Sequence, residues 1–172
     1  SFQADGPLDM RMDPTQGETA AGLVARMDVS ELARLFRGLG EEPQALRVAK
    51  AVVRARETGT IQTTGRLAEV VSAARGGRRL GGKHPATRVF QALRMGVNRE
   101  LEALEIALED GLRVLEPDGR LVVITFESLT DRMVKQRFAA HAGRHVSLQQ
   151  GGARWEGERP AVELLVRRPL TA

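Results

Sequence analysis

Cysteine is missing from this 172-residue sequence, histidine occurs three times, and there is one tryptophan and no tyrosine. Without thiols the chain has neither a disulfide framework nor a thiolate metal site, so no metal centre is expected. No apolar run approaches the roughly 20 residues that span a bilayer, and no signal-peptide pattern is present. These absences predict a cytoplasmic globular protein with no membrane association. The scarcity of aromatic residues argues against a protein that stacks many bases of a single strand.

Lysine is also scarce, and arginine takes its place. Lysine and arginine together number 26, of which only Lys50, Lys83 and Lys135 are lysines, and the net charge is +4. Arginine suits bidentate phosphate contacts and stacking on bases. The base composition of the genome explains the same excess, so the excess is compatible with nucleic-acid binding without establishing it.

The first two fifths of the chain are dominated by helical patterns. Residues 1–16 have no regular period and are predicted to form a loop. Capping-box spacing then occurs at Thr15 with Glu18 and at Asp28 with Glu31. A later helix is expected to be capped by Thr63 or Thr64. The predicted helices cover residues 17–26, 29–38, 42–56 and 64–74.

A glycine- and arginine-rich segment, residues 75–83, interrupts the helices and is predicted to be a basic loop. After it, apolar residues recur every three or four positions from Phe90 to Leu115, which predicts one helix over residues 86–115. Such a helix would be about 45 Å long, which is more than one small core requires. We therefore expect it to connect two bodies.

The last part of the chain changes to strand patterns. Residues 120–126 form a β-branched apolar run typical of a buried strand, and Ser128 is expected to cap the helix that follows. Residues 145–148 and 162–166 alternate as strands. This order matches the end of a doubly wound sheet. Strands this apolar need neighbours that the chain does not encode.

Three blocks of sequence together identify a family: residues 5–13 (DGPLDMRMD), 84–102 (HPATRVFQALRMGVNRELE) and 124–132 (ITFESLTDR). From Phe2 to about Phe138 the chain resembles the bacterial small-subunit ribosomal RNA cytosine-N4 methyltransferase family, in which these blocks have the same order. The family's glycine-rich loop for S-adenosylmethionine and its acidic-Leu-Gly segment have no counterpart here. The resemblance implies an N-terminally truncated enzyme whose cofactor site lies mostly outside this chain, which we expect to be inactive alone.

The resemblance also implies an architecture. The fold class is α/β, with the C-terminal portion of a doubly wound class I methyltransferase sheet plus an all-helical insert domain. Residues 1–16 would form an active-site flap loop, residues 17–110 the helical insert for RNA recognition, and residues 111–172 the C-terminal strands and helix of the methyltransferase domain. The implied partner is ribosomal RNA or the small ribosomal subunit, while the oligomeric state stays open.

The flap contains the first candidate site residues. Asp9 is a candidate catalytic residue that accepts a hydrogen bond from an exocyclic amine, and Arg11 is a candidate substrate contact for a phosphate or the base. The alternative for this loop is a structural turn with a surface ion pair. The resemblance favours the flap.

The second group of candidates surrounds the start of the long helix. Arg78, Arg79 and Lys83 in the basic loop would bind phosphate, although a solvated linker would have the same composition. His84 and Arg88 follow on the first helical turn, where backbone N–H groups already attract anions. A histidine at a helix start is more often a cap than a catalyst, and the resemblance favours substrate contact for both residues.

The third group follows residues 120–126, at the end of a predicted strand, where doubly wound enzymes place functional residues. Glu127 and Ser128 are catalytic candidates and Arg132 is a substrate-contact candidate. The family usually has histidine at the position of Glu127 and glutamate at the position of Thr130. The groups that could transfer protons at this site therefore differ from the family pattern.

Two alternative hypotheses for the function of the protein remain. A non-catalytic RNA-binding or scaffold protein derived from the same family would keep the helical insert, and the changes at Glu127 and Thr130 favour it. A helical protein-interaction module would explain the long amphipathic helix but not the basic loop.

Overall fold

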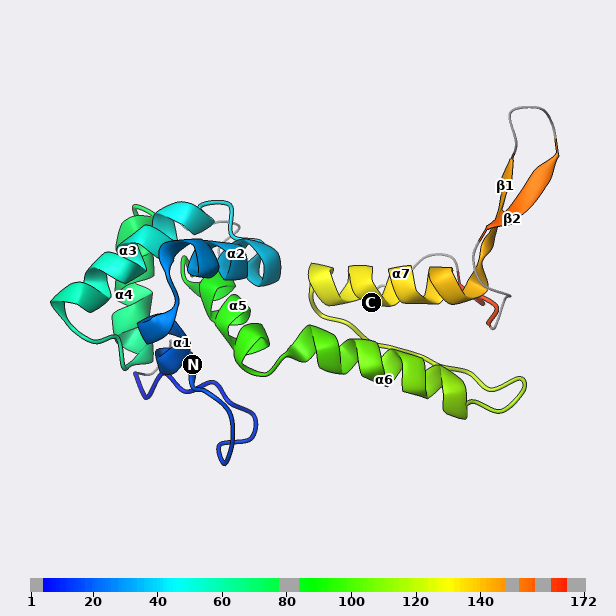
Figure 1. Cartoon of the computed structure of the whole chain (residues 1–172), viewed down its shortest axis with the longest axis horizontal. Helices are drawn as coiled ribbons and strands as arrows, with labels where there is room; N and C mark the ends of the chain where they lie inside the picture. Colours follow the sequence, from blue (N-terminus) through cyan, green and yellow to red (C-terminus); the bar gives the residue numbers. More distant parts are fainter. Residues whose placement is uncertain (1–4, 78–83, 148–151, 157–161, 167–172) are drawn as a thin grey trace. The chain divides into compact units, whose positions relative to one another are not determined.

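The computed structural model describes residues 5–77, 84–147, 152–156 and 162–166. The chain divides into two compact units, Ser1–Glu100 and Leu101–Ala172, and each is described by itself. Figure 1 shows the helices and the two strands in chain order. In the part of the chain that is described, no helix is both long and apolar enough to cross a membrane.

The first unit is helical. Its helices are α1 (Ala20–Arg26), α2 (Val29–Gly40), α3 (Ala45–Thr58), α4 (Thr64–Ala74) and α5 (Thr87–Val97). Helix α2 packs against α3 and α5, and α3 also packs against α4 (Figure 1). The helices predicted over 29–38, 42–56 and 64–74 are confirmed to within a few residues.

Two of the predicted helix caps are confirmed. At the start of α2, the Asp28 side chain accepts from the Glu31 N–H while the Glu31 carboxylate accepts from the Asp28 N–H, each over 2.8 Å. At the start of α4, Thr63 Oγ1 accepts from the Arg66 N–H. Each cap satisfies an N–H group that has no partner within its helix.

The cap expected at Thr15 is wrong. Thr15 donates from both its N–H and its hydroxyl to Asp13, so it closes a turn in the loop before α1. Gly17 has a left-handed φ of 80°, which also prevents a helix from starting there. Helix α1 begins later, after Thr19, whose side chain accepts from the Gly22 N–H.

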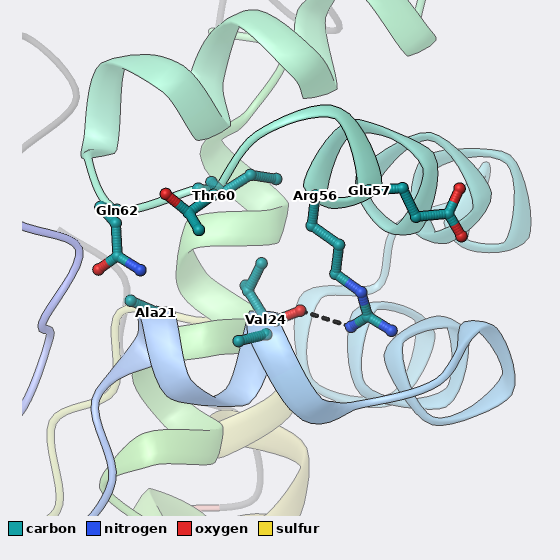
Figure 2. A pocket seen from close by; sticks show the side chains of 8 residues that line it. Ala21, Val24, Arg56, Glu57, Thr60 and Gln62 are labelled. Atoms are coloured by element: carbon teal, nitrogen blue, oxygen red, sulfur yellow. Dashed lines mark hydrogen bonds between the residues drawn. The ribbon is translucent and has the colours of Figure 1, made fainter.

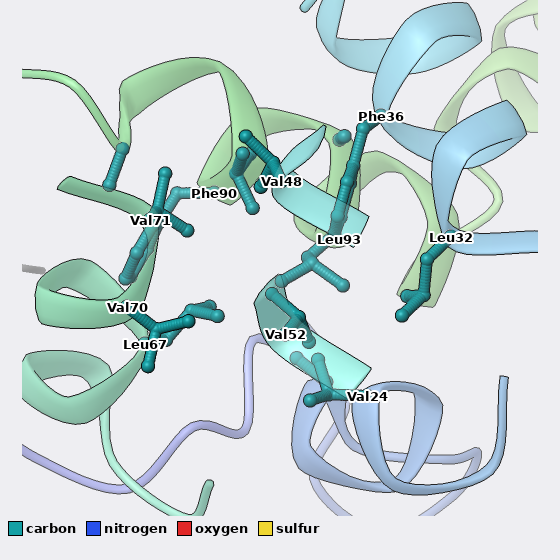
Figure 3. Close-up of a cluster of buried hydrophobic side chains, with 14 of the residues drawn as sticks. Val24, Leu32, Phe36, Val48, Val52, Leu67, Val70, Val71, Phe90 and Leu93 are labelled. Carbon is teal, nitrogen blue, oxygen red and sulfur yellow. The ribbon is translucent and has the colours of Figure 1, made fainter. Parts of the chain in front are cut away.

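The core of the first unit is formed by apolar side chains from all five helices and from Leu8, Ile61 and Ala86. Figure 3 shows Phe36 and Leu32 of α2, Val52 of α3 and Leu93 of α5 converging on the same interior, and all four are fully buried. Fully burying one such side chain contributes about 1.5–3 kcal/mol. The loop and helix positions of this unit are therefore fixed by shared apolar contacts.

The single helix predicted over residues 86–115 is wrong, because the structure has two helices here. Helix α5 ends at Val97 and α6 begins at Glu100. Between them Arg99 has a left-handed φ of 48°, and the Arg94 guanidinium pairs with the Glu100 carboxylate at 2.7 and 3.0 Å across the corner. The boundary between the two units follows Glu100.

The second unit contains α6 (Glu100–Val114), α7 (Ser128–Ala142) and a two-stranded antiparallel sheet of β1 (Arg144–Ser147) and β2 (Ala153–Glu156). In the sheet, Arg144 lies opposite Glu156 and Ser147 opposite Ala153. Ion pairs connect α6 and α7: Arg137 pairs with Glu105 and Glu109, and His141 contacts Glu109 at 3.0 Å.

The predicted strands are confirmed only in part. Strand β1 agrees with the strand expected over 145–148 as far as Ser147, and residue 148 lies outside the described residues. Residues 162–166 do not form the expected strand, and the partner of β1 is residues 153–156 instead. Residues 120–126 are not a strand either, because a strand needs a neighbour for its N–H and C=O groups and the described residues supply none. Of the expected doubly wound sheet, the described part of the chain therefore shows only this hairpin.

Candidate functional site

The loop before α1, residues 5–13, is anchored to the helical unit. The side chain of Leu8 is buried in the core, its N–H donates to the Gln62 carbonyl, and its carbonyl accepts from the Ala21 N–H, each over 2.8 Å. Pro7 forms an antiparallel bridge with Thr63. The loop has therefore one defined position on this unit.

A second anchor comes from Asn98, directly after α5. Its amide N–H donates to the Met10 carbonyl, and its Oδ1 accepts from the Met12 N–H, both at 2.8 Å. Met10 has a left-handed φ of 66°, and these two bonds hold the residues on either side of its turn. Sequence reasoning assigned no role to Asn98, because this residue lies inside the long apolar pattern from Phe90 to Leu115.

Between these anchors Asp9 and Arg11 form a bidentate ion pair. Arg11 Nε donates to Asp9 Oδ1 at 2.7 Å, a second guanidinium nitrogen donates to Oδ2 at 2.8 Å, and the Arg11 N–H donates to Oδ1 at 3.1 Å. These bonds from Arg11 lower the pKa of Asp9 from 3.8 to about 2, and the pairing raises the pKa of Arg11.

The Asp9 side chain is 39% exposed, so its carboxylate is both ionised and accessible near neutral pH. An ionised carboxylate only accepts hydrogen bonds. The structure thus brings the two flap candidates together, and the arrangement can accept from an amine group while a guanidinium stands beside it.

Of the candidates around the start of α5, Arg78, Arg79 and Lys83 lie outside the described residues. His84 Nδ1 accepts from the Ala86 N–H at 3.2 Å, which is a turn contact before the helix. Arg88 donates to the Glu41 carbonyl at 2.6 Å, at the C-terminal end of α2. In this structure both side chains therefore have local structural partners.

Arg75, the first residue of the predicted basic loop, is not available for phosphate. Its guanidinium is buried and donates to Glu42 Oε2 at 3.2 Å and to the Pro85 carbonyl at 2.8 Å. The Glu42 carboxylate also accepts from the Gln44 N–H at 3.0 Å. This buried pair joins the end of α4 to the segments before α3 and α5, and sequence reasoning missed it because it spans 33 residues.

The third group of candidates begins α7. Glu127 is the N-cap residue, without a side-chain cap bond, and Ser128 is the first helical residue, so the expected Ser128 cap is wrong. The Glu127 carbonyl accepts from the Asp131 N–H and from the Thr130 hydroxyl, each at 3.0 Å. Arg132 lies exposed on the first turn of the same helix. Catalytic roles for these residues stay predictions.

A hollow of about 370 Å³ lies between α1, the end of α3 and residues 60–62, and Figure 2 shows the side chains that line it. Arg56 lies in its wall and donates to the carbonyls of Val24 and Met27 at 2.7 and 2.6 Å, so it caps the C-terminal end of α1. Glu57 also lines the hollow, so its charged lining residues are one cation and one anion. No group of described residues could hold a metal ion.

Comparison with known proteins adds to this geometry. The model of the MraW methylase family matches residues 1–172. A protein of Symbiobacterium thermophilum named ribosomal RNA small subunit methyltransferase H is 49% identical over 174 residues, which cover 100% of this chain and 54% of that protein. Proteins of the same name from Thermomicrobium roseum and Burkholderia cenocepacia are 49% and 52% identical, covering 99% and 83% of this chain and 52% and 46% of their own length. The chain spans about half the length of the curated relatives it matches.

Proposed function

The chain belongs to the MraW methylase family, and from that premise we propose that it is the RNA-recognition part of an S-adenosylmethionine-dependent methyltransferase that acts on small-subunit ribosomal RNA. The names of its relatives, which specify ribosomal RNA and the small subunit, support this substrate. Such an enzyme works in the cytoplasm on ribosomal RNA or the small subunit itself.

We propose that the methylated atom is the exocyclic N4 of a cytidine. That nitrogen's lone pair is delocalised into the ring, so an acceptor that draws on its hydrogens favours attack on a methyl group. The anchored loop with its ionised, accessible Asp9 is the observation that carries this proposal. Placing such an acceptor in advance lowers the barrier because no reorganisation is needed during the reaction. The target base must leave its stack to reach the loop.

The methyl donor, S-adenosylmethionine, supplies a sulfonium methyl group when bound. We propose that most of its site lies outside the residues described above, because the glycine-rich loop that the resemblance implies for it has no counterpart in this sequence. Residues 78, 79, 83, 84, 88 and 132 remain proposed RNA contacts, and Glu127 and Ser128 remain catalytic candidates.

A doubly wound sheet is the second part of the proposal. Residues 121–127 alternate between half-buried and exposed, with Val122 82%, Ile124 77% and Phe126 93% exposed. This period of two is that of a strand with one uncovered face. We propose that sheet strands beyond the described residues pair with this segment and place Glu127 at a strand end.

A chimaera tests the function. The part of the Symbiobacterium thermophilum relative that this chain does not match is joined to the chain and incubated with small ribosomal subunits and the methyl donor, and the RNA is digested to nucleosides for mass spectrometry. We expect N4-methylcytidine, and Asp9→Asn should lower its rate on the order of 100-fold.

Asp13→Asn is the matched control. Asp13 is in the same loop, and hydrogen bonds from Thr15 and Gln16 lower its pKa to about 2 as well, whereas the charge of Arg11 is the smallest of the causes. If the chimaera binds RNA without any methyl transfer, the protein is a non-catalytic RNA-binding member of the family. If Asp9→Asn and Asp13→Asn behave alike, Asp9 is not the acceptor.

A further inference from the structure

We propose that the outer face of α2 and α3 binds the phosphate backbone of double-stranded RNA. A groove of about 580 Å³ lies on this face, and four of the residues that line it are cationic: Arg37, Arg47, Lys50 and Arg54. No acidic residue lines it. We call it the basic groove. The proposal rests on the proposed function only in taking RNA as the partner, and it adds a surface that none of the candidate site residues belongs to.

The cationic side chains of α3 form one stripe. Arg47, Lys50 and Arg54 are spaced by three and four residues, so they lie on one helix face. All three are exposed. The stripe is about 10 Å long from the first to the third residue, at 1.5 Å per residue. Arg37, in the last turn of α2, extends it across the groove.

These charges differ from those of some other exposed cationic side chains in the first unit, which are neutralised by carboxylates. Within the part of the chain that the structure describes, none of the four makes an ion pair. By contrast Arg26 pairs with Glu18 and Arg66 pairs with Glu69. The polar contact of Arg54 Nε is a hydrogen bond to the Lys50 carbonyl at 3.3 Å. Among the described residues the basic groove therefore presents four positive charges that no ion pair offsets.

The start of α3 adds to the positive potential. Gln44 and Leu46 also line the groove, and the N-cap Gln44 makes no side-chain hydrogen bond to the first turn. The Gln44 and Ala45 N–H groups donate to the carboxylate and the carbonyl of Glu42, so only the N–H groups that follow them at this helix start can attract a phosphate oxygen. Backbone dipole and side-chain charge therefore favour the same kind of ligand.

The lining residues decide between a duplex and a single strand. No aromatic residue lines the groove, so unpaired bases have no aromatic side chain on which to stack. Arginine and lysine contacts to phosphate need no base readout and give affinity without sequence preference. The basic groove thus fits the backbone of a structured RNA helix, which would hold the RNA while the anchored loop acts elsewhere.

The test compares two triple variants of the 172-residue chain in binding a 20-base-pair RNA duplex over a series of salt concentrations. Arg47→Gln, Lys50→Gln and Arg54→Gln remove the stripe. Each phosphate contact contributes about 0.9 to the slope of log affinity against log salt on a duplex. We therefore expect this variant to flatten the slope by about 2–3 and to bind at least about 10-fold more weakly at low salt.

The control variant is Arg26→Gln, Arg66→Gln and Arg113→Gln. It removes the same number of positive charges, but from exposed ion pairs elsewhere. It should leave the slope within about one contact of the parent. Circular dichroism of both variants checks that the helical content is unchanged. Equal losses in the two variants would overturn the proposal, since only net charge would then matter, and so would an undetectable affinity of the parent chain for the duplex.

A same-length single strand is measured in parallel. If the stripe substitutions weaken single-strand binding more than duplex binding, the duplex assignment is wrong. The chimaera described above separates this proposal from the proposed function. Groove-dependent duplex binding without methyl transfer refutes the function alone, whereas methyl transfer with an unchanged salt slope in the stripe variant refutes the basic groove alone.

Discussion

Ser1–Glu100 holds every residue of the hydrophobic core cluster, from Leu8 to Leu93. In Leu101–Ala172 the buried apolar side chains among the described residues are Leu108 and Val134, while Val122, Ile124 and Phe126 are largely exposed. The two units are thus stabilised in different ways. The first buries its own apolar faces, whereas the second exposes strand-like apolar side chains that only further protein surface would cover.

Among the described residues, the first unit has a fully buried ion pair and the second unit has none. In the first unit, Glu42 and Arg75 are 0% and 3% exposed and are held by additional backbone partners. In the second unit, the pairs between α6 and α7, such as Arg137 with Glu105, lie at the solvent boundary with side chains about two fifths exposed. Exposed pairs contribute only about 0–1 kcal/mol each. Polar contacts therefore cannot replace the missing core of the second unit.

The largest expected difference is in the cooperativity of unfolding when the two units are prepared as separate fragments. Residues 1–100 should unfold in urea with one cooperative transition, because their core is complete. Residues 101–172 should show no cooperative transition and should bind the dye ANS, since their apolar surface is open. Circular dichroism and fluorescence measure both. An equally steep transition in residues 101–172 would break the comparison.

Replacing one phenylalanine in each unit tests the difference between their cores. Phe36→Ala should destabilise the first unit by about 3–5 kcal/mol, because Phe36 is fully buried and its removal leaves a cavity. Phe126→Ala should change stability by less than about 0.5 kcal/mol, because the side chain is 93% exposed. Urea denaturation of the 172-residue chain gives both values. Comparable losses would mean that Phe126 is covered in solution.

The ion pairs offer a comparison of intermediate size. Arg75→Met should cost about 3 kcal/mol, because it leaves the Glu42 carboxylate buried without its cation. Arg113→Met, which breaks the exposed pair with Asp110, should cost about 0.5 kcal/mol or less. Adding Glu42→Gln to Arg75→Met should restore part of the loss, since the uncompensated charge disappears. If the double variant is no more stable than Arg75→Met, buried charge is not the cause.

The smallest effect concerns the pH dependence of the anchored loop. The hydrogen bonds from Arg11 lower the pKa of Asp9 from 3.8 to about 2. The stabilisation from this pair is therefore complete above the ordinary pKa of 3.8 and is lost as the pH falls through about 2. Titration of the Asp9 carboxyl by NMR should show the low pKa, and Arg11→Gln should return it towards 3.8. An unchanged pKa in that variant would show that Arg11 is not its cause.

Local sequence signals determined much of the first unit. Helices α2 and α4 follow from the residue types next to each helix start, which also predict the Asp28 and Thr63 caps. These signals involve residues within four positions of each other, so the local sequence is enough to predict them. The three sequence blocks also identified the family, which the comparisons confirm.

Long-range packing decided the rest. The break at Arg99 leaves the three-and-four apolar spacing intact, so periodicity could not reveal it. The pairing of Arg75 with Glu42, the Asn98 bonds to the loop and the convergence of Arg37 with the α3 stripe each join residues far apart in sequence. Residues 120–126 have the composition of a buried strand, but whether a segment becomes a strand depends on a partner for its backbone groups. Composition and period specify what each segment can form, and only the tertiary structure decides which surfaces are covered.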